Sequence, residues 1–202
     1  MNNNQLESYQ RFVERYKTDE VPWDDVLPPP EAIELLADLP PGRGLDLGCG
    51  YGRASIYLAQ LGWTTDGIDF VPSAIAEANR RAAEAQVAER IRFHVGSVTE
   101  LDFLEAGYDF ALDVGCLHNF DEPQRIAYEA HLRRLLKPEA WYLLFAHMAD
   151  LAAEQPRAKV DETAVRALFA DYFTLERIER GVTEIPDMAP WRSAWFWFRR
   201  KK

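Results

Sequence analysis

The sequence is poor in cysteine, in basic residues and in long apolar runs, and each shortage excludes a class of protein. Two cysteines, Cys49 and Cys116, in 202 residues are too few for a disulfide framework. Asp and Glu outnumber Lys and Arg by 33 to 23, and the resulting net charge of −10 argues against binding nucleic-acid phosphates. The longest apolar run, AWYLLFA, is too short to cross a bilayer. We therefore expect no nucleic-acid or membrane partner and a reducing, cytoplasmic location.

Metal-binding patterns are also absent from the sequence. No His, Asp and Glu residues cluster at the spacing of metal ligands, so we expect no bound metal. Apolar residues make up 48% of the chain, which is enough for a folded core. The sequence therefore predicts a globular protein.

Strand-like and helix-like segments alternate along most of the chain, which is typical of a parallel sheet covered by helices. The last two strand-like runs have no helix between them and should add antiparallel strands at one edge. We predict an α/β, Rossmann-like, doubly wound, mostly parallel seven-stranded sheet with antiparallel strands at one edge. A single domain is expected over residues 1–202, with an N-terminal helix and lid loop at 1–29 and the core at 30–202. The expected strands are residues 42–48, 63–69, 91–95, 108–114, 141–146, 173–180 and 193–200, and the expected helices are 5–17, 30–39, 53–62, 73–86, 123–136 and 161–170.

The stretch LDLGCGYGR at residues 45–53 places three glycines directly after the first strand of the alternating part. Open α/β sheets bind ligands at the carboxyl ends of their strands, where glycines allow a tight turn and a close approach of the ligand to the backbone. Asp69 follows the second strand, where a carboxylate can accept hydrogen bonds from both hydroxyls of a ribose. A plain strand-to-helix turn would need the glycines but not this carboxylate. The spacing therefore indicates a nucleoside ligand.

The glycine spacing also separates two classes of nucleoside-binding enzyme. Dinucleotide enzymes use G-x-G-x-x-G, whereas here the third glycine comes one residue early and Arg53 stands in its place. LDLGCGYGR resembles motif I of the class I S-adenosylmethionine-dependent methyltransferases. IDFVPSAI, YDFALDVGCLHNF and RRLLKPEAWYLLF resemble later segments of that family. VPWDDVLPPPEAIELL is similar to a segment of its small-molecule bacterial branch, which methylates thiopurines, thiols, halides or tellurite.

This resemblance implies S-adenosyl-L-methionine as the cofactor and S-adenosyl-L-homocysteine as a product. The glycines would lie against the methionine part, Asp46 would hold its ammonium group, and Asp69 would bind the ribose. Phe70 would lie against the adenine, and Trp23 would close over the cofactor. Many members carry an aspartate after the third strand, where this chain has Ser97 and Val98. The cofactor-binding residues implied are Trp23, Asp46, Gly48, Gly50, Gly52, Asp69, Phe70, Ser97 and Val98.

Residues after the fourth strand are the candidates on the acceptor side. Asp113 and His118 should face or flank the methyl group. The imidazole of His118 can act as a general base near neutral pH; it can equally orient a loop or line the pocket. His147 and Trp191 should border the same pocket.

The activity expected from these features is in-line transfer of a methyl group to a small molecule through sulfur, oxygen, nitrogen or a soft inorganic atom. A non-catalytic S-adenosylmethionine-binding module or sensor is one alternative, and a nicotinamide-dependent oxidoreductase is another. We expect a monomer or homodimer. The N-terminal segment, with Tyr9, Phe12, Tyr16 and Trp23, is either a mobile lid or a helix packed permanently on the core.

Overall fold

Seven strands form the sheet in the computed structural model, in the order β3-β2-β1-β4-β5-β7-β6. The structure describes residues 3–18, 21, 23–149, 160–184 and 190–202. Contacts within the chain group residues 1–98 into one unit and residues 99–202 into a second. Strand β2 pairs in parallel with β1 and with β3, and β4 pairs in parallel with β5. Strand β7 is antiparallel to both β5 and β6. The predicted fold class is therefore confirmed.

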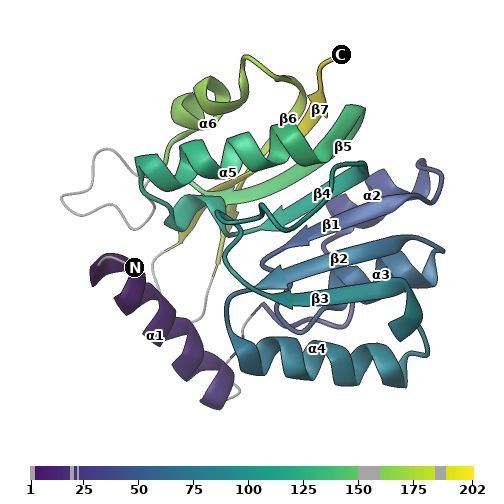
Figure 1. Ribbon diagram of the computed structural model, residues 1–202. Helices are drawn as coiled ribbons and strands as arrows, with labels where there is room; N and C mark the ends of the chain where they lie inside the picture. Colours follow the sequence, from purple (N-terminus) through teal and green to yellow (C-terminus); the bar gives the residue numbers. More distant parts are fainter. Residues whose placement is uncertain (1–2, 19–20, 22, 150–159, 185–189) are drawn as a thin grey trace. The chain divides into compact units, whose positions relative to one another are not determined.

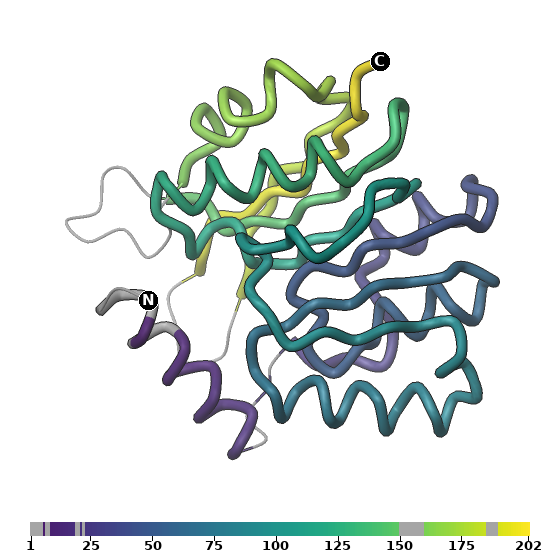
Figure 2. The backbone as a smooth tube through the Cα atoms, viewed as in Figure 1, coloured from purple at the N-terminus to yellow at the C-terminus, as the bar shows by residue number. Residues whose placement is uncertain are grey.

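The first unit alternates strands and helices (Figures 1 and 2). The ends of its strands are in register, with Leu47 paired to Ile68 and Asp69 paired to Val95. Helix α3 packs on β1 and β2, and α4 packs on β2 and β3. The elements are α1 (Asn3–Thr18), α2 (Pro30–Ala37), β1 (Arg43–Leu47), α3 (Arg53–Gln60), β2 (Thr64–Asp69), α4 (Pro72–Glu84), η1 (Ala88–Arg90) and β3 (Ile91–Val95).

The second unit holds the mixed part of the sheet. Strand β7 lies between β5 and β6 and is antiparallel to both, as the two late strand-like runs predicted. Helices α5 and α6 contact one another. The elements are β4 (Tyr108–Val114), η2 (Leu117–Asn119), α5 (Glu122–Leu135), β5 (Leu136–His147), α6 (Glu162–Phe169), β6 (Phe173–Thr183) and β7 (Trp191–Arg200).

Strand β5 is longer than the sequence predicted. It follows α5 without a loop, because the segment around Pro138 and Glu139 is included in the strand as an irregularity. Glu139 has a positive φ of 65°, and the pairing with β4 shifts between Tyr108 and Phe110. The strand therefore begins before residue 141, where the sequence predicted its start.

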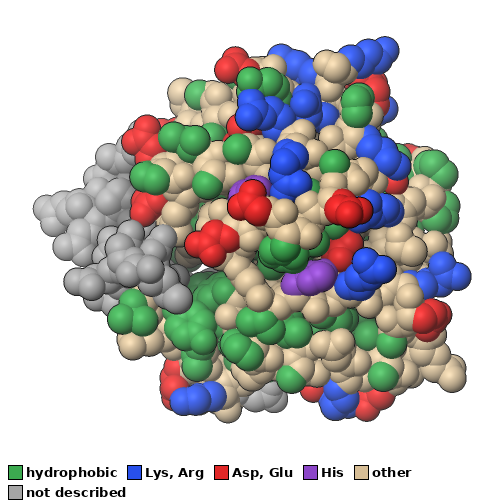
Figure 3. Space-filling model, in the orientation of Figure 1, with side chains coloured by type: hydrophobic (Ala, Val, Ile, Leu, Met, Phe, Trp, Pro, Cys, Tyr) green, Lys and Arg blue, Asp and Glu red, His purple; other side chains and the backbone are tan. Residues whose placement is uncertain are grey.

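The basic residues at the C-terminus belong to the structure of the second unit. Blue side chains gather near the C-terminus in Figure 3. Arg199 donates to the carbonyl of Glu139, Arg200 to that of Arg133, and Lys201 to that of Ala170. These contacts give the tail a local stabilising role. Among the described residues, no helix is both long and apolar enough to span a membrane.

Candidate functional site

The glycine-rich turn between β1 and α3 has a backbone that requires glycine. Gly48, Gly50 and Gly52 have φ values of 71°, 54° and 81°, a region that L side chains enter at a cost. The N–H groups of Gly48 and Cys49 both donate to the carbonyl of Ile68, at 2.8 and 2.9 Å. The turn is thereby fixed to the end of β2.

Two of these glycines leave room for different neighbours. A Cβ on Gly50 would lie 3.1 Å from the hydroxyl of Tyr16 and 3.9 Å from Nε1 of Trp23. A Cβ on Gly52 would lie 2.7 Å from Cζ of Phe93, which is inside van der Waals contact. Gly52 therefore accommodates the Phe93 ring, and Gly50 lies beside Tyr16 and Trp23. The contact of Gly52 with the cofactor stays a prediction.

Asp69 joins the end of β2 to this turn. Its Oδ2 accepts from the N–H of Gly50 at 3.1 Å, and its Oδ1 accepts from the N–H of Val71 at 2.9 Å. The hydroxyl of Tyr16 is a further hydrogen-bond partner. Burial raises the pKa of Asp69 to about 6, because desolvation outweighs these hydrogen bonds. The sequence spacing thus identified a carboxylate held directly against the second glycine.

Asp46 has a local partner that sequence reasoning missed. Helix α3 follows Gly52, which has no side chain to cap the free N–H groups of the helix. Asp46 supplies the acceptor instead, because its Oδ2 binds both the N–H and the hydroxyl of Ser55, at 3.0 and 2.7 Å. Burial raises the pKa of Asp46 to about 6. A serine at the third position of the helix, nine residues after Asp46, was the available signal.

Aromatic side chains of α1 cover this part of the first unit. The rings of Tyr9 and Phe12 lie 5.6 and 5.5 Å from that of Phe70. Tyr16 contacts the rings of Tyr51 and Trp23, at 5.1 and 6.0 Å. The structure therefore brings the predicted Trp23 and Phe70 into one cluster with the glycine turn.

The segment after β3 begins beside Asp69. The N–H of Gly96 donates to the carbonyl of Asp69 at 3.0 Å. Ser97 is half-buried, and the side chain of Val98 is buried. The side chain of Val98 therefore belongs to the core.

Asp113 in the second unit is a structural carboxylate. It is fully buried and accepts from the N–H groups of Cys116 and Leu117, at 2.6 and 3.2 Å, and from the hydroxyl of Tyr128 at 2.7 Å. Tyr128 also contacts the hydroxyl of Tyr142. Burial raises the pKa of Asp113 to about 6. Asp113 therefore holds the η2 turn that carries His118. Its predicted place facing or flanking the methyl group stays a prediction.

His118 lies in an aromatic cluster at the ends of β4, β5 and β7. Its Nδ1 accepts from the backbone N–H of His147 at 3.2 Å, which assigns the proton of the neutral ring to Nε2. The ring of His147 stacks on Trp191 at 4.0 Å with an interplanar angle of 10°. Burial lowers the pKa of His147 to about 4, so this ring is neutral at pH 7. His118, His147 and Trp191 were all predicted to share a pocket, and they do form one cluster.

No group of three or more His, Cys, Asp or Glu in the described part of the chain is placed to hold a metal ion. Neither Cys49 nor Cys116 forms a disulfide. The backbone of Gly50 lies beside the Asp69 carboxylate and the side chains of Tyr16 and Trp23, an arrangement that suits a nucleoside cofactor.

Comparison with known proteins agrees with the fold and with the predicted cofactor. A family model described as a methyltransferase domain matches residues 45–139. The 2-heptyl-1-hydroxyquinolin-4(1H)-one methyltransferase of Mycobacteroides abscessus is 28% identical over 163 residues, which cover 78% of this chain and 70% of that enzyme. The tRNA (adenine(58)-N(1))-methyltransferase of Thermus thermophilus is 30% identical over 177 residues, which cover 86% of this chain and 61% of that enzyme.

A solved structure extends the likeness to the whole chain. The 1,6-didemethyltoxoflavin-N1-methyltransferase of Burkholderia thailandensis, with bound 1,6-didemethyltoxoflavin and S-adenosylhomocysteine, has a TM-score of 0.78 and 26% identity. The match covers 100% of this chain and 92% of that one. The family model, these relatives and the solved structure with bound S-adenosylhomocysteine support the conclusion that the chain is an S-adenosylmethionine-dependent methyltransferase with S-adenosylmethionine as its cofactor.

Proposed function

We propose that this enzyme transfers the methyl group of S-adenosylmethionine to a small planar heteroaromatic acceptor and releases S-adenosylhomocysteine. The observation that supports the choice of cofactor is the position of the Asp69 carboxylate, whose Oδ2 accepts from the N–H of Gly50 at 3.1 Å. The choice of a planar heteroaromatic acceptor is supported by the stacked rings of His147 and Trp191. It is also supported by relatives named for small heteroaromatic substrates. The proposal treats residues 1–202 as one methyltransferase domain. The proposal includes a cytoplasmic location, as the low cysteine content of the sequence suggests.

In this proposal the residues of the first unit bind and orient the cofactor. Asp69 accepts from the ribose hydroxyls, and Phe70 lies against the adenine beside Ser97 and the backbone of Val98. Gly48 and Gly50 lie along the methionine part. Asp46 has both of its hydrogen bonds on Oδ2, which leaves Oδ1 for the ammonium group. Trp23 covers the cofactor and excludes water.

The chemistry asked of the protein is mainly positioning. The cofactor, when bound, supplies an activated methyl group on its sulfonium. The protein must hold the accepting atom in line with that carbon at contact distance, which accounts for several kcal/mol of the barrier. An acceptor that is already a thiolate, a soft anion or a neutral nitrogen with a free lone pair needs little help from a base. The finer possibility of a thiopurine, thiol, halide or tellurite acceptor, supported by VPWDD at residues 21–25, falls within the same mechanism.

His118 should act as a hydrogen-bond donor to the acceptor and not as a general base. Its basic Nδ1 is already engaged by the N–H of His147, so the proton on Nε2 is the group it can offer. We expect His118→Gln, whose amide also donates, to lower kcat/KM by less than about tenfold, whereas loss of a general base would cost about 10²–10⁴-fold. A pH–rate profile that loses its acidic limb in this variant would contradict the donor role.

Cofactor binding should weaken in acid. The pKa of Asp69 is raised to about 6, and hydrogen bonds from ribose hydroxyls favour the ionised carboxylate, so binding displaces a proton below that pH. We expect the affinity for S-adenosylhomocysteine to fall by about tenfold between pH 7 and pH 5, as measured by calorimetry. In Asp69→Asn the part of the dependence due to Asp69 should disappear. An affinity that is constant between these pH values in the unmodified protein would refute this assignment.

A panel of acceptors tests the proposed activity. The protein is incubated with labelled S-adenosylmethionine and with hydroxyquinolinones, pteridine-like heterocycles, thiols, halides, tellurite and bulk tRNA, and labelled products are counted. Methylation of a heterocycle supports the proposal, and methylation of tRNA alone would overturn its acceptor half. Tight cofactor binding without turnover on any acceptor would favour the non-catalytic module. Binding of NADH in place of S-adenosylmethionine would favour the oxidoreductase.

A further inference from the structure

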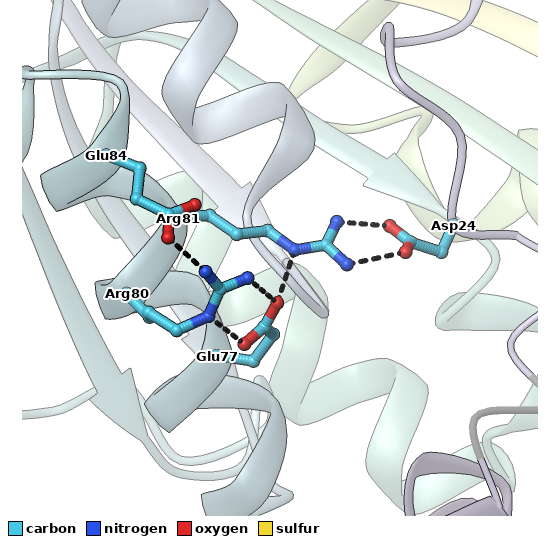
Figure 4. A network of polar contacts seen from close by, with 5 residues as sticks. All are labelled: Asp24, Glu77, Arg80, Arg81 and Glu84. Atoms are coloured by element: carbon cyan, nitrogen blue, oxygen red, sulfur yellow. Dashed lines mark hydrogen bonds and ion pairs between the residues drawn. The ribbon is translucent and has the colours of Figure 1, made fainter.

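The loop that carries Trp23 (residues 23–29) is fastened to helix α4 by a two-point ion pair. Arg81 NH1 donates to Asp24 Oδ1 at 2.9 Å, and Arg81 NH2 donates to Asp24 Oδ2 at 2.8 Å (Figure 4). The two residues are 57 positions apart in the sequence. The side chains are 31% and 22% exposed, so the pair is partly shielded from solvent. Paired parallel hydrogen bonds of this kind give strength and fix the orientation of both partners.

The guanidinium of Arg81 is itself held in place from two sides. Its Nε donates to Glu77 Oε1 at 2.7 Å, and its central carbon lies 4.5 Å from the centre of the Tyr51 ring. Glu77 also accepts from Arg80, which contacts Glu84 in turn (Figure 4). Arg81, on α4, therefore contacts both the Trp23 loop and the glycine turn. Its contacts with Glu77 and Tyr51 orient the guanidinium and do not involve the loop.

The position of Asp24 decides the position of Trp23. Asp24 follows Trp23 directly, and its N–H donates to the carbonyl of Val21 at 2.9 Å, which closes a turn around Trp23. The indole Nε1 lies 3.9 Å from the place that a Cβ on Gly50 would occupy. Tyr51, under the guanidinium, contacts Tyr16, which contacts Trp23. Fastening Asp24 thus keeps the indole over the second glycine.

We propose that Arg81 is a positioning residue that latches the Trp23 loop over the glycine turn and thereby slows release of the cofactor. This inference rests on the proposed cofactor role of the first unit. A lysine at this position would keep the charge but would lose the planar, two-point contact with Asp24. The latch is ionic and partly exposed, so its effect should decrease as salt is added.

The test compares Arg81→Met with Arg80→Met. Arg80 lies on the same helix and also pairs with Glu77, but its second ion pair is with Glu84 and not with Asp24. For Arg81→Met we expect S-adenosylhomocysteine to dissociate about five- to tenfold faster and to bind correspondingly more weakly, with a smaller difference from the unmodified protein at 1 M salt. Arg80→Met should stay within about twofold. The dissociation rate of Arg81→Lys should lie between those of Arg81→Met and Arg80→Met.

A second measurement does not depend on the cofactor. In the cofactor-free protein, the backbone N–H of residue 24 should exchange faster in Arg81→Met and in Asp24→Asn than in the unmodified protein. Its exchange rate should be unchanged in Arg80→Met. Asp24→Asn leaves α4 unaltered and keeps the test valid if Arg81→Met folds poorly. Equal dissociation rates in Arg81→Met and Arg80→Met, or unchanged exchange at Asp24, would overturn the latch. Failure of the unmodified protein to bind S-adenosylhomocysteine would instead overturn the cofactor site, whatever the exchange result.

Discussion

Asp69→Ala should weaken binding of S-adenosylhomocysteine by about 10- to 150-fold. The carboxylate is expected to accept from the ribose hydroxyls, and hydrogen bonds to a charged group contribute about 1.5–3 kcal/mol. The same substitution also releases the N–H of Gly50 and of Val71 from their acceptor, so the glycine turn loses one of its ties to the end of β2 and keeps those to the carbonyl of Ile68. Both effects act on the free energy of binding in the same direction. Isothermal titration calorimetry at pH 7.5 measures the change.

Asp66→Ala is the matched control for this prediction. Asp66 lies on the same strand and is also buried, but it pairs with His94 at 2.8 Å and with Arg43 at 3.7 Å and not with the glycine turn. We expect it to lower thermal stability and to leave the affinity nearly unchanged. If the two variants bind the ligand equally well, Asp69 does not contact the cofactor.

Gly52→Ala should destabilise the fold by about 2–5 kcal/mol. An L side chain at φ 81° costs roughly 1–2 kcal/mol. The new Cβ would lie 2.7 Å from the Phe93 ring and 3.2 Å from Cβ of Ala78, and an overpacked core costs about 1–3 kcal/mol more. The free energy of unfolding from urea titration measures the sum.

Gly62→Ala separates the two contributions. Gly62 also has a positive φ, of 91°, but a Cβ there would lie 3.7 Å from its nearest neighbour, Pro41, which is an ordinary contact. This variant should therefore lose only the backbone part, about 1–2 kcal/mol. Adding Phe93→Leu to Gly52→Ala should recover part of the packing loss. Equal losses for the two glycine variants would show that Phe93 does not limit position 52.

Much of the fold could be predicted because its signals are local. The bounds of β3 and β4 were correct to the residue, since each is a short apolar run between polar turns. Strand β5 was predicted too short, because Pro138 normally ends a strand and here lies within an irregular one. The antiparallel edge followed from the absence of a helix between the last two runs.

The proximity of candidate residues could be predicted where a motif fixes their geometry. The burial of a candidate side chain could not, because it depends on residues elsewhere in the sequence. The neighbourhood of Asp69 and Gly50 follows from parallel strands ending at one edge. The fully buried state of Asp113 could not be read from its place at a strand end, because it depends on Tyr128, which lies 15 residues further on. The contact of Arg81 with Asp24 joins segments 57 residues apart. No sequence pattern in either segment predicts it.

The Phe93 ring occupies space that both Gly52 and Gly67 leave empty, since a Cβ on either would lie 2.7 Å from it. A Cβ on Gly67 would also lie 2.9 Å from Oγ of Ser55, the hydroxyl that donates to Asp46. An alanine at position 67 would therefore have to displace both the Phe93 ring and this hydroxyl, so a smaller residue at position 93 alone would not make room for it.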